Sequence, residues 1–364
     1  MTKQRRHIDF LDAIRGCAAL AVFLFHVRHA VLEYLPVNKF TGISDILKDG
    51  WMGVAVFFAL SGFCIHLSHI RSVSHGWSTY FSKRFCRIVP SYVVALLTFV
   101  TLTVIFDGYR AVSIPDAVVH LLGLHNFVPS FVHSFNGSFW SIAVEMQLYV
   151  LYPLVFIVQK RFGWWAALLL TGCMEAALRF AVVFNMVPGG DFGSTFVSML
   201  PTYFWFSWTV GAFAADNYHH GRISNLGKLP PLLALCLCVA VLNVTVLSHF
   251  RFPLISILAA SCLERWSLGT TWSPNVQGVV RRHLTTLGTV SYSFYLYHQP
   301  FMNFIFKAST RSATNPTVLI LMLVTGVILL YIGLFHVAKL LYRVVELRKP
   351  SVMPSAKVDI AKVI

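Results

Sequence analysis

The stretch LDAIRGCAALAVFLFHVRH, residues 11–29, has the composition of a membrane-spanning helix but contains Arg15 near one end and His26 deep along it. A rise of about 1.5 Å and a turn of about 100° per residue place them roughly 16 Å apart, within about 20° of the same helix face. Because ionisable groups are costly inside a bilayer, a cation and an imidazole on one face are candidates for function. The alternatives are an interfacial anchor for Arg15, paired with Asp12, and a buried neutral histidine for His26.

The same apolar character extends over the chain, in which 57% of the 364 residues are hydrophobic and only 12% are charged. A bilayer core needs about 20 residues of helix, and apolar runs of that length recur along the sequence. We therefore predict an all-α, polytopic transmembrane helical bundle of about ten spans, and exclude a soluble domain. The predicted spans are 10–31, 51–70, 88–106, 139–158, 163–184, 196–215, 229–248, 253–265, 285–306 and 316–341. The longest loop is 107–138, where a surface helix is expected near 114–124.

The distribution of charge predicts the orientation of these spans. The formal net charge of +15 comes from basic clusters between the spans, which argues against a nucleic-acid partner. Most of the 29 lysines and arginines fall on one side if the N-terminus is inside, so we predict that both termini are cytoplasmic. The seven cysteines lack the spacing of metal ligands, and we expect no metal and no permanently bound cofactor. Asp9, Asp12 and Arg15 interrupt the apolar stretch near the N-terminus, which indicates a retained span rather than a signal peptide.

The fourth predicted span contains a carboxylate, Glu145, within SFWSIAVEMQLYVLYPL, residues 138–154. Tyr149 follows at i+4, so the two side chains share a helix face. Imidazole is the commonest general base near neutral pH, and a carboxylate can support it as the third member of a catalytic triad does. His26 and Glu145 are thus a candidate base and its support. The alternative for Glu145 is a structural partner of a cation such as Arg179.

Two further segments place polar groups at the ends of predicted spans. In YFSKRFCRIVPSY, Arg84 and Arg87 share a helix face if the helix begins before them, and such clusters bind phosphates or anionic lipid headgroups. In TVSYSFYLYHQPFM, Tyr295 and His298 lie within one turn. Pro300 follows them and is expected to loosen the helix and free backbone groups beside them.

Other polar residues are interpreted as structural. Glu175 and Arg179 are four residues apart in the fifth predicted span, which favours a neutralising pair. Ser61, within ALSGF, is expected to pack or to bend the backbone, because no GxSxG nucleophile motif surrounds it. Asn136 begins a match to a glycosylation sequon on the predicted outer side.

Five motifs, in this order, resemble those of the integral-membrane acyltransferase 3 family across residues 7–341. They are FLDAIRGCAALAVFLFHV with its Arg15–His26 pair, FFALSGFCI, FSKRFCRIVPSY, FWSIAVEMQLYVLYPL with Glu145, and SYSFYLYHQP with His298. The resemblance implies an O-acyltransferase, usually an O-acetyltransferase, that acts on cell-surface or exported glycans. The candidate site residues are then His26 and Glu145 for catalysis; Arg15, Arg84 and Arg87 for binding the donor; and Tyr149, Tyr295 and His298 for binding the substrate.

The resemblance also implies the donor and the cellular setting. The donor is an acyl-CoA, most simply acetyl-CoA, that enters from the cytoplasm, and its phosphates lie about 20 Å from its thioester when it is extended. The acceptor is a glycan or lipid-linked glycan, such as an exopolysaccharide unit, a lipopolysaccharide antigen or a lipo-oligosaccharide. Residues 1–341 would form the acyltransferase domain among the lipids of a bacterial cytoplasmic (inner) membrane, and 342–364 a cytoplasmic tail.

Two questions stay open at the level of sequence. His26 could take a proton from the acceptor hydroxyl, or could carry the acyl group as an acyl-imidazole. The alternative hypothesis is a different class of protein, a proton-coupled transporter or flippase of a glycan or lipid precursor. In it, Glu145, His26 and His298 relay protons.

Overall fold

The computed structural model describes residues 3–34, 47–72, 76–225, 227–267, 278–312 and 315–346, and every regular element within them is helical. The principal helices are α1 (Lys3–Tyr34), α3 (Gly53–Ile70), α4 (Trp77–Asp107), α5 (Ile114–Leu121), α6 (Phe139–Val183), α7 (Gly190–Ser198), α8 (Trp205–His219), α9 (Pro231–Asn243), α10 (Arg251–Ser267), α11 (Val279–Thr289), α12 (Ser291–Ser312) and α13 (Pro316–Leu341). A π-helical turn, η7 (Tyr342–Glu346), follows α13. The all-α prediction is confirmed for the described residues, outside which most of the predicted tail, 347–364, lies.

Five of the described helices are long and apolar enough to cross a membrane, at residues 10–32, 50–70, 77–107, 139–183 and 317–346. The 45-residue α6 contains a break at Gly163, where φ is 85° and ψ is 172°. These dihedral angles are open to glycine alone among the common residues. The break divides α6 into two helices that coincide with the fourth and fifth predicted spans.

Two of the other predicted spans are each divided between two α-helices. The predicted span at 196–215 is divided, because α7 ends before Pro201 and α8 begins only after the 3₁₀ turn η5 (Pro201–Phe204). Proline cannot donate the backbone hydrogen bond that a continuous helix would need there. The predicted span at 285–306 is likewise shared between α11 and α12, which meet at Val290. The prediction of one continuous helix at each of these places is wrong.

Helix boundaries around the basic segment and the long loop follow local sequence. α4 begins at Trp77, well before the predicted start at residue 88, so Arg84 and Arg87 lie on the helix itself. The expected surface helix near 114–124 is confirmed by α5, which the Ser113 hydroxyl caps by accepting a hydrogen bond from the Asp116 amide.

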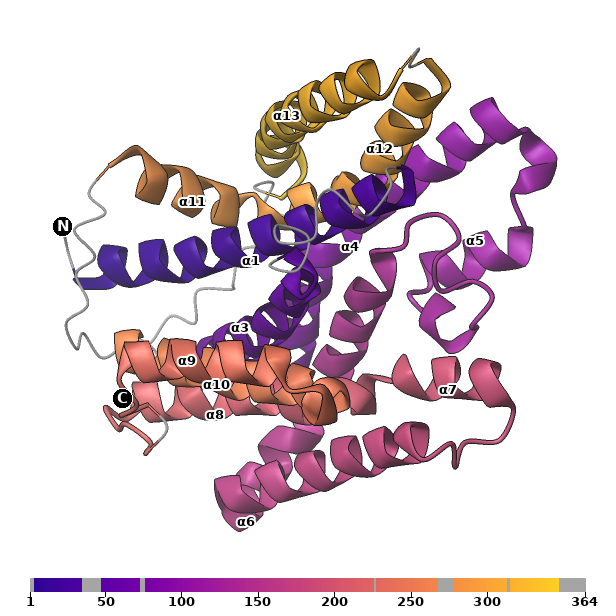
Figure 1. Cartoon of the computed structure of the whole chain (residues 1–364). Coiled ribbons are helices and arrows are strands. Elements are labelled where there is room, and N and C mark those ends of the chain that lie inside the picture. The colour runs from indigo at the N-terminus through magenta and orange to yellow at the C-terminus, as the bar shows by residue number, and fades with distance from the viewer. Residues whose placement is uncertain are drawn as a thin grey trace, which may run out of the picture.

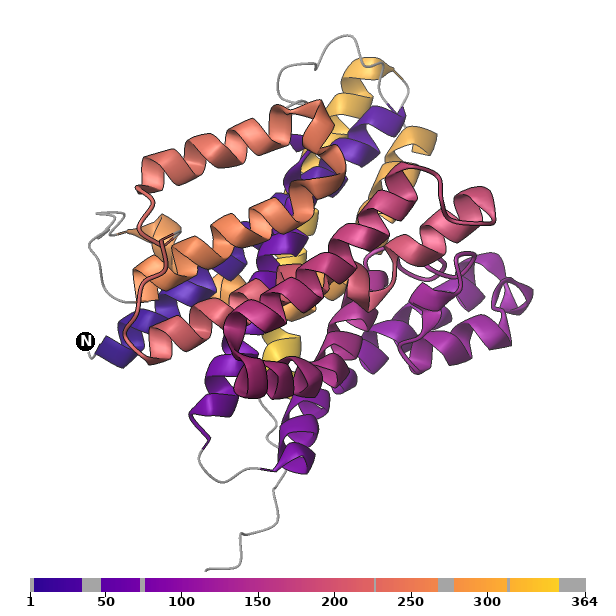
Figure 2. The same ribbon diagram turned by 90° about the horizontal axis from the view of Figure 1, so that it is seen from below.

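Glycines let the central helices approach closely. Gly62 of α3 lies against the backbone of Trp208 in α8, and Gly288 of α11 lies against the backbone of Asp12 in α1. A side chain at either glycine would overlap a backbone carbonyl, as is typical of small residues at helix contacts in membrane proteins. As a result α1 packs on both α3 and α11, while α8, α9 and α10 gather on the other side of α3 (Figure 1). Figure 2 shows the same group of helices from below.

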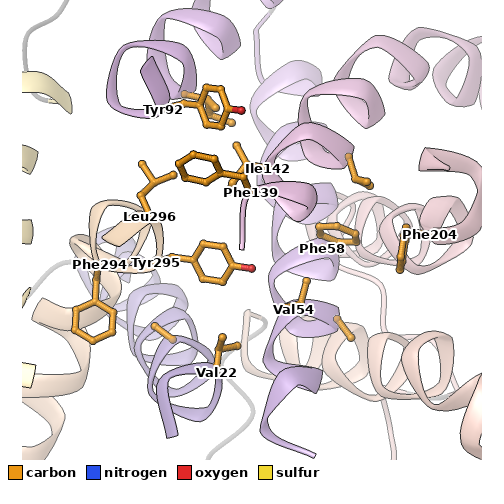
Figure 3. Close-up of a cluster of buried hydrophobic side chains, with 14 of the residues drawn as sticks. Val22, Val54, Phe58, Tyr92, Phe139, Ile142, Phe204, Phe294, Tyr295 and Leu296 are labelled. Atoms are coloured by element: carbon orange, nitrogen blue, oxygen red, sulfur yellow. The ribbon is translucent and has the colours of Figure 1, made fainter. Parts of the chain in front are cut away.

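The buried core joins α1, α3, α4, α6 and α12 around aromatic side chains (Figure 3). Phe58, Phe139 and Phe294 are each at most 2% exposed. Tyr295 points from α12 across the centre of this cluster toward α3. The core therefore places a polar hydroxyl between the helices that carry most of the predicted site residues.

A proline inside α6 creates a specific link between two helices. Pro153 lacks the amide hydrogen that would otherwise bond to the Tyr149 carbonyl, four residues earlier. The Tyr80 hydroxyl of α4 donates to that carbonyl instead, at 3.2 Å. The bond ties α4 to the turn of α6 that carries Tyr149, one of the predicted site residues.

Candidate functional site

A cavity of about 210 Å³ lies between α1, α3, α4, α6, α11, α12 and η7. Six of the eight predicted site residues line it: Arg15, Arg84, Arg87, Glu145, Tyr149 and Tyr295. Its other polar lining residues include Asp12, Ser61, Cys64, Ser141, Tyr292 and Glu346. The remaining two predicted residues, His26 and His298, do not line this cavity. The structure thus brings together the predicted cations and Glu145, and places the two histidines outside the cavity.

The three arginines of the cavity differ in how they are held. Arg15 forms an ion pair with Asp12 at 2.7 Å, and its Nη2 donates to the Cys64 sulfur at 2.9 Å. Arg84 and Arg87 form no salt bridge with any carboxylate in the described part of the chain. The Arg84 Nε is also buried without a hydrogen-bond partner there. Because a buried guanidinium N–H normally finds an acceptor, Arg84 points to an anionic ligand, and the exposed Arg87, three residues on, adds a second cation at the same cavity.

Glu145 is held by hydroxyl groups from two helices. Its Oε1 accepts a hydrogen bond from the Ser61 Oγ at 2.7 Å and one from the Tyr149 hydroxyl at 2.6 Å. Ser61 in turn accepts from the Trp208 indole at 3.2 Å. No hydrogen bond or ion pair joins Glu145 to Arg179 or to His26 among the described residues. The hydroxyl of Ser61, which we interpreted as a packing residue, therefore belongs to the polar site, and no local motif could have shown this.

The two histidines lie in contact with each other. The Nε2 of His298 is 3.1 Å from the Nδ1 of His26, and their ring centroids are 4.8 Å apart. The Nδ1 of His26 is also 2.9 Å from the Val22 carbonyl, and the Nδ1 of His298 is 2.6 Å from the Tyr295 carbonyl. His298 is only 1% exposed. The sequence placed both residues at the site but gave no indication that they are partners.

Tyr295 connects the cavity with this pair. Its ring lies 5.3 Å from that of His298, measured between centroids, and its hydroxyl lies 2.8 Å from the Ser141 Oγ. Phe57, another cavity residue, contacts the Tyr295 ring edge-on. Tyr295 therefore lies between the cavity, which it lines, and the imidazole of His298, which its ring contacts.

The end of the long loop is attached to α12 on either side of His298. Pro300 leaves the Leu296 carbonyl without its helical donor, and the side-chain Nδ2 of Asn136 donates to it at 2.7 Å. Two residues on, the Ser138 hydroxyl donates to the Gln299 side chain, also at 2.7 Å. This confirms the expectation that Pro300 frees a backbone group. Asn136, read as the start of a sequon, is only 2% exposed in the folded chain.

The loop also contains a pair of buried histidines that the sequence analysis missed. The rings of His120 and His125 stack with centroids 3.9 Å apart and an interplanar angle of 7°. The Nδ1 of His120 lies 2.9 Å from an oxygen of Asp116. Burial lowers the pKa of His125 to about 3, so this ring is neutral near pH 7. The pair forms part of the interior of the loop.

The structural interpretation of Glu175 and Arg179 agrees with the geometry. Arg179 donates to Glu175 at 2.8 Å, both side chains are buried, and Ser207 donates to the same carboxylate. A second buried carboxylate, Glu264 of α10, accepts from Asn217 at 2.6 Å and was not singled out from the sequence. The contacts of Glu175 and those of Glu264 each join helices away from the cavity.

Comparison with known proteins places most of this chain in one family. The model of a family described as an acyltransferase domain matches residues 8–335. A putative peptidoglycan O-acetyltransferase, YrhL, of Bacillus subtilis is 24% identical over 349 residues, covering 86% of this chain and 51% of YrhL. The acyltransferase MdmB of Streptomyces mycarofaciens is 27% identical, and the match covers 79% of this chain and 77% of MdmB. Nodulation protein 10 of Rhizobium leguminosarum is 25% identical, and the match covers 82% of this chain and 83% of the nodulation protein.

The coverage differs between these relatives. The chain spans about half the length of YrhL, and 42% of a putative acetyltransferase, ORF330, of Acidianus two-tailed virus, to which it is 30% identical over 154 residues. No solved structure matches the chain.

Proposed function

This chain belongs to the acyltransferase 3 family, and from that premise we propose that it transfers an acyl group, most simply acetyl, from acyl-CoA to a hydroxyl of a cell-surface or exported glycan. The observation that carries the proposal is the cavity, which Arg84 and Arg87 line together with Glu145, and in which neither arginine has a carboxylate partner among the described residues. A ligand with several phosphate charges at one end and an uncharged reactive group at the other suits such a cavity. Coenzyme A thioesters have this form.

The donor enters from the cytoplasm in this proposal. The chain crosses a bacterial cytoplasmic membrane about ten times, with both termini inside, so that the first turns of α4 face the cytoplasm. Arg84 and Arg87 on those turns bind the phosphates, and Arg15, oriented by Asp12, binds a third anionic oxygen. The thioester then extends past Tyr149 toward Tyr295, which lies between the cavity and the histidines.

In this proposal the base for acyl transfer is His26, which lies on the side of Tyr295 away from the cavity. His26 removes the proton of the acceptor hydroxyl, the oxygen attacks the thioester carbonyl, and the carbon–sulfur bond breaks. The CoA thiolate that leaves takes the proton from His26, so the side chains return to their starting state. Glu145, fixed by Ser61 and Tyr149, supplies negative charge that offsets the imidazolium through space. The alternative route through an acyl-imidazole on His26 predicts a trapped acyl-enzyme.

The acceptor is a glycan hydroxyl in this proposal. The name of YrhL refers to peptidoglycan and that of a Staphylococcus aureus relative, OatA, to O-acetyl transfer, which supports a polysaccharide acceptor. The 107–138 loop is suited to contact it, because Asn136 and Ser138 hold the end of this loop against the turn beside His298.

Transfer of label from radioactive acetyl-CoA tests this function. Membranes with the wild type, His26→Ala or His29→Ala are incubated with the donor, and glycan and lipid fractions are counted separately. His29 is the matched control, since it is an exposed histidine one turn further along α1. We expect label in the glycan fraction with the wild type and His29→Ala, and a loss of about 100-fold or more with His26→Ala. Equal transfer by His26→Ala would refute the role of His26, and a precursor moved across the membrane without label would favour a transporter.

A further inference from the structure

The contact between His298 and His26 determines which nitrogen carries each proton. The Nδ1 of His298 lies 2.6 Å from the Tyr295 carbonyl, and a carbonyl oxygen only accepts hydrogen bonds, so this nitrogen carries the proton. In the neutral ring the Nε2 of His298 is then an acceptor, and it lies 3.1 Å from the Nδ1 of His26. The Nδ1 of His26 must therefore be the donor of this pair.

The second neighbour of His26 agrees with this assignment. The Nδ1 of His26 also lies 2.9 Å from the Val22 carbonyl, which again can only accept. That carbonyl is four residues earlier in α1 and is already the expected acceptor of the His26 backbone amide. The Nε2 of His298 has no other donor among the described residues, so it is the acceptor available to the Nδ1 proton of His26. With the proton on Nδ1, the Nε2 of His26 holds the free lone pair.

From this geometry we infer that His298 is a positioning residue, which fixes His26 in the tautomer whose Nε2 can take a proton from the acceptor hydroxyl. This inference rests on the proposed function, in which His26 is the base. As the proton arrives at Nε2, His26 becomes an imidazolium, and its Nδ1–H bond to His298 becomes charge-assisted and stronger. The proton later leaves from Nε2 to the CoA thiolate, so that His298 gains and loses none.

His298 has the rigidity that such a role requires. It is 1% exposed, and its ring lies against that of Tyr295. The helix on either side of it is held by the Asn136 side chain on the Leu296 carbonyl and by Ser138 on Gln299. No carboxylate forms an ion pair with His26 or His298 within the described residues, so the neutral imidazole of His298 takes the place that an aspartate has in a catalytic triad.

Two substitutions of His298 separate positioning from packing. The side chain of His298→Gln is long enough to put an amide oxygen near the position of Nε2, where it can accept from His26. The side chain of His298→Asn reaches only as far as Nδ1. We expect His298→Asn to lower kcat by about 100-fold or more at a KM for acetyl-CoA within twofold of the wild type, and His298→Gln to recover at least a tenth of the wild-type kcat. Equal kcat values for the two variants would overturn the inference. A rise in the KM for acetyl-CoA that matches the fall in kcat would overturn it as well.

A second measurement does not depend on activity. Solid-state nitrogen NMR of the wild-type chain labelled with ¹⁵N-histidine distinguishes protonated from bare ring nitrogens, and the spectra of His26→Ala and His298→Asn assign the signals. We expect the proton of His26 on Nδ1 with Nε2 bare, and the proton of His298 on Nδ1. A proton on the Nε2 of neutral His26 would overturn the inference even if acetyl transfer is observed. Failure of the proposed function would instead appear as absent transfer with these tautomers intact.

Discussion

The Oγ of Ser61 lies 2.7 Å from the Oε1 of Glu145, although 84 residues separate them in the sequence. This bond joins α3 to α6 and fixes the carboxylate at the wall of the cavity that Arg84 and Arg87 also line. Since Ser61 also accepts from the Trp208 indole, its hydroxyl proton is directed at Glu145. The orientation of the carboxylate therefore depends on a residue of the second apolar segment.

Removal of the Ser61 hydroxyl should slow acyl transfer. Ser61→Ala leaves the Trp208 indole without its acceptor and takes a donor from Glu145, and a hydrogen bond to a charged group is worth about 1.5–3 kcal/mol. We expect the transfer rate to fall roughly 10- to 100-fold, measured with radioactive acetyl-CoA. Ser68→Ala, at an exposed serine of the same helix, is the control and should keep the wild-type rate. Equal rates for the two variants would contradict this role.

The ion pair between Asp12 and Arg15 should affect donor binding more than chemistry. Asp12→Asn weakens the partner that orients Arg15, and a partly exposed pair of this kind is worth about 1 kcal/mol. We expect the KM for acetyl-CoA to rise several-fold while kcat stays within twofold. Initial rates over a range of donor concentrations separate the two parameters. A fall in kcat at constant KM would argue that Arg15 acts elsewhere.

The buried pair of Glu175 and Arg179 should matter for stability rather than for catalysis. Glu175→Gln leaves a buried guanidinium without its counter-charge, at a cost of about 3–5 kcal/mol. Thermal unfolding in detergent, followed by tryptophan fluorescence, should show a clear drop in the midpoint. A Glu175→Gln/Arg179→Met double variant should recover part of the loss, since it removes the unpaired charge as well. An unchanged midpoint for the single variant would show that the pair is not stabilising.

The buried ring of His125 predicts a dependence of stability on pH. Its pKa is about 3 in the fold and about 6.5 in an unfolded chain, so between these values only the unfolded state binds the proton. Stability is therefore lost as the pH falls through this window, by about 1.4 kcal/mol per unit for this group. His125→Phe keeps an aromatic ring and should remove that part of the dependence between pH 7.5 and pH 5. His133→Phe, at an exposed histidine of the same loop, should keep it.

Much of the fold follows from runs of apolar residues, because a helix in lipid must satisfy its own backbone. The bounds predicted for the last span, 316–341, are those of α13, which Pro316 starts and Asn315 caps. The third span was predicted too short, since α4 continues through the basic residues from Trp77. An apolar run shows which residues of a helix lie in lipid. The helix can extend beyond that run, because its backbone hydrogen bonds continue through polar residues into water.

Six of the eight predicted residues line one cavity, whereas the partners of these residues were not predictable. Helical spacing placed Tyr149 on the face of Glu145, and the two are hydrogen-bonded at 2.6 Å. The same periodicity placed Arg15 and His26 on one face, yet they occupy different surroundings, one in the cavity and the other against His298. Contacts between helices, such as those of Ser61 and His298, depend on how the helices pack, and the period of a single helix contains no information on that.

Equilibrium binding of acetyl-CoA to the purified protein tests the central claim most directly, because it asks whether the cavity is a donor site. Titration calorimetry would compare the wild type, an Arg84→Gln/Arg87→Gln double variant and Lys83→Gln, whose exposed lysine lies beside these arginines but does not line the cavity. We predict binding by the wild type and Lys83→Gln, and affinity at least tenfold weaker for the double variant, the equivalent of about 1.4 kcal/mol. Equal binding by all three, or none by the wild type, would contradict the account.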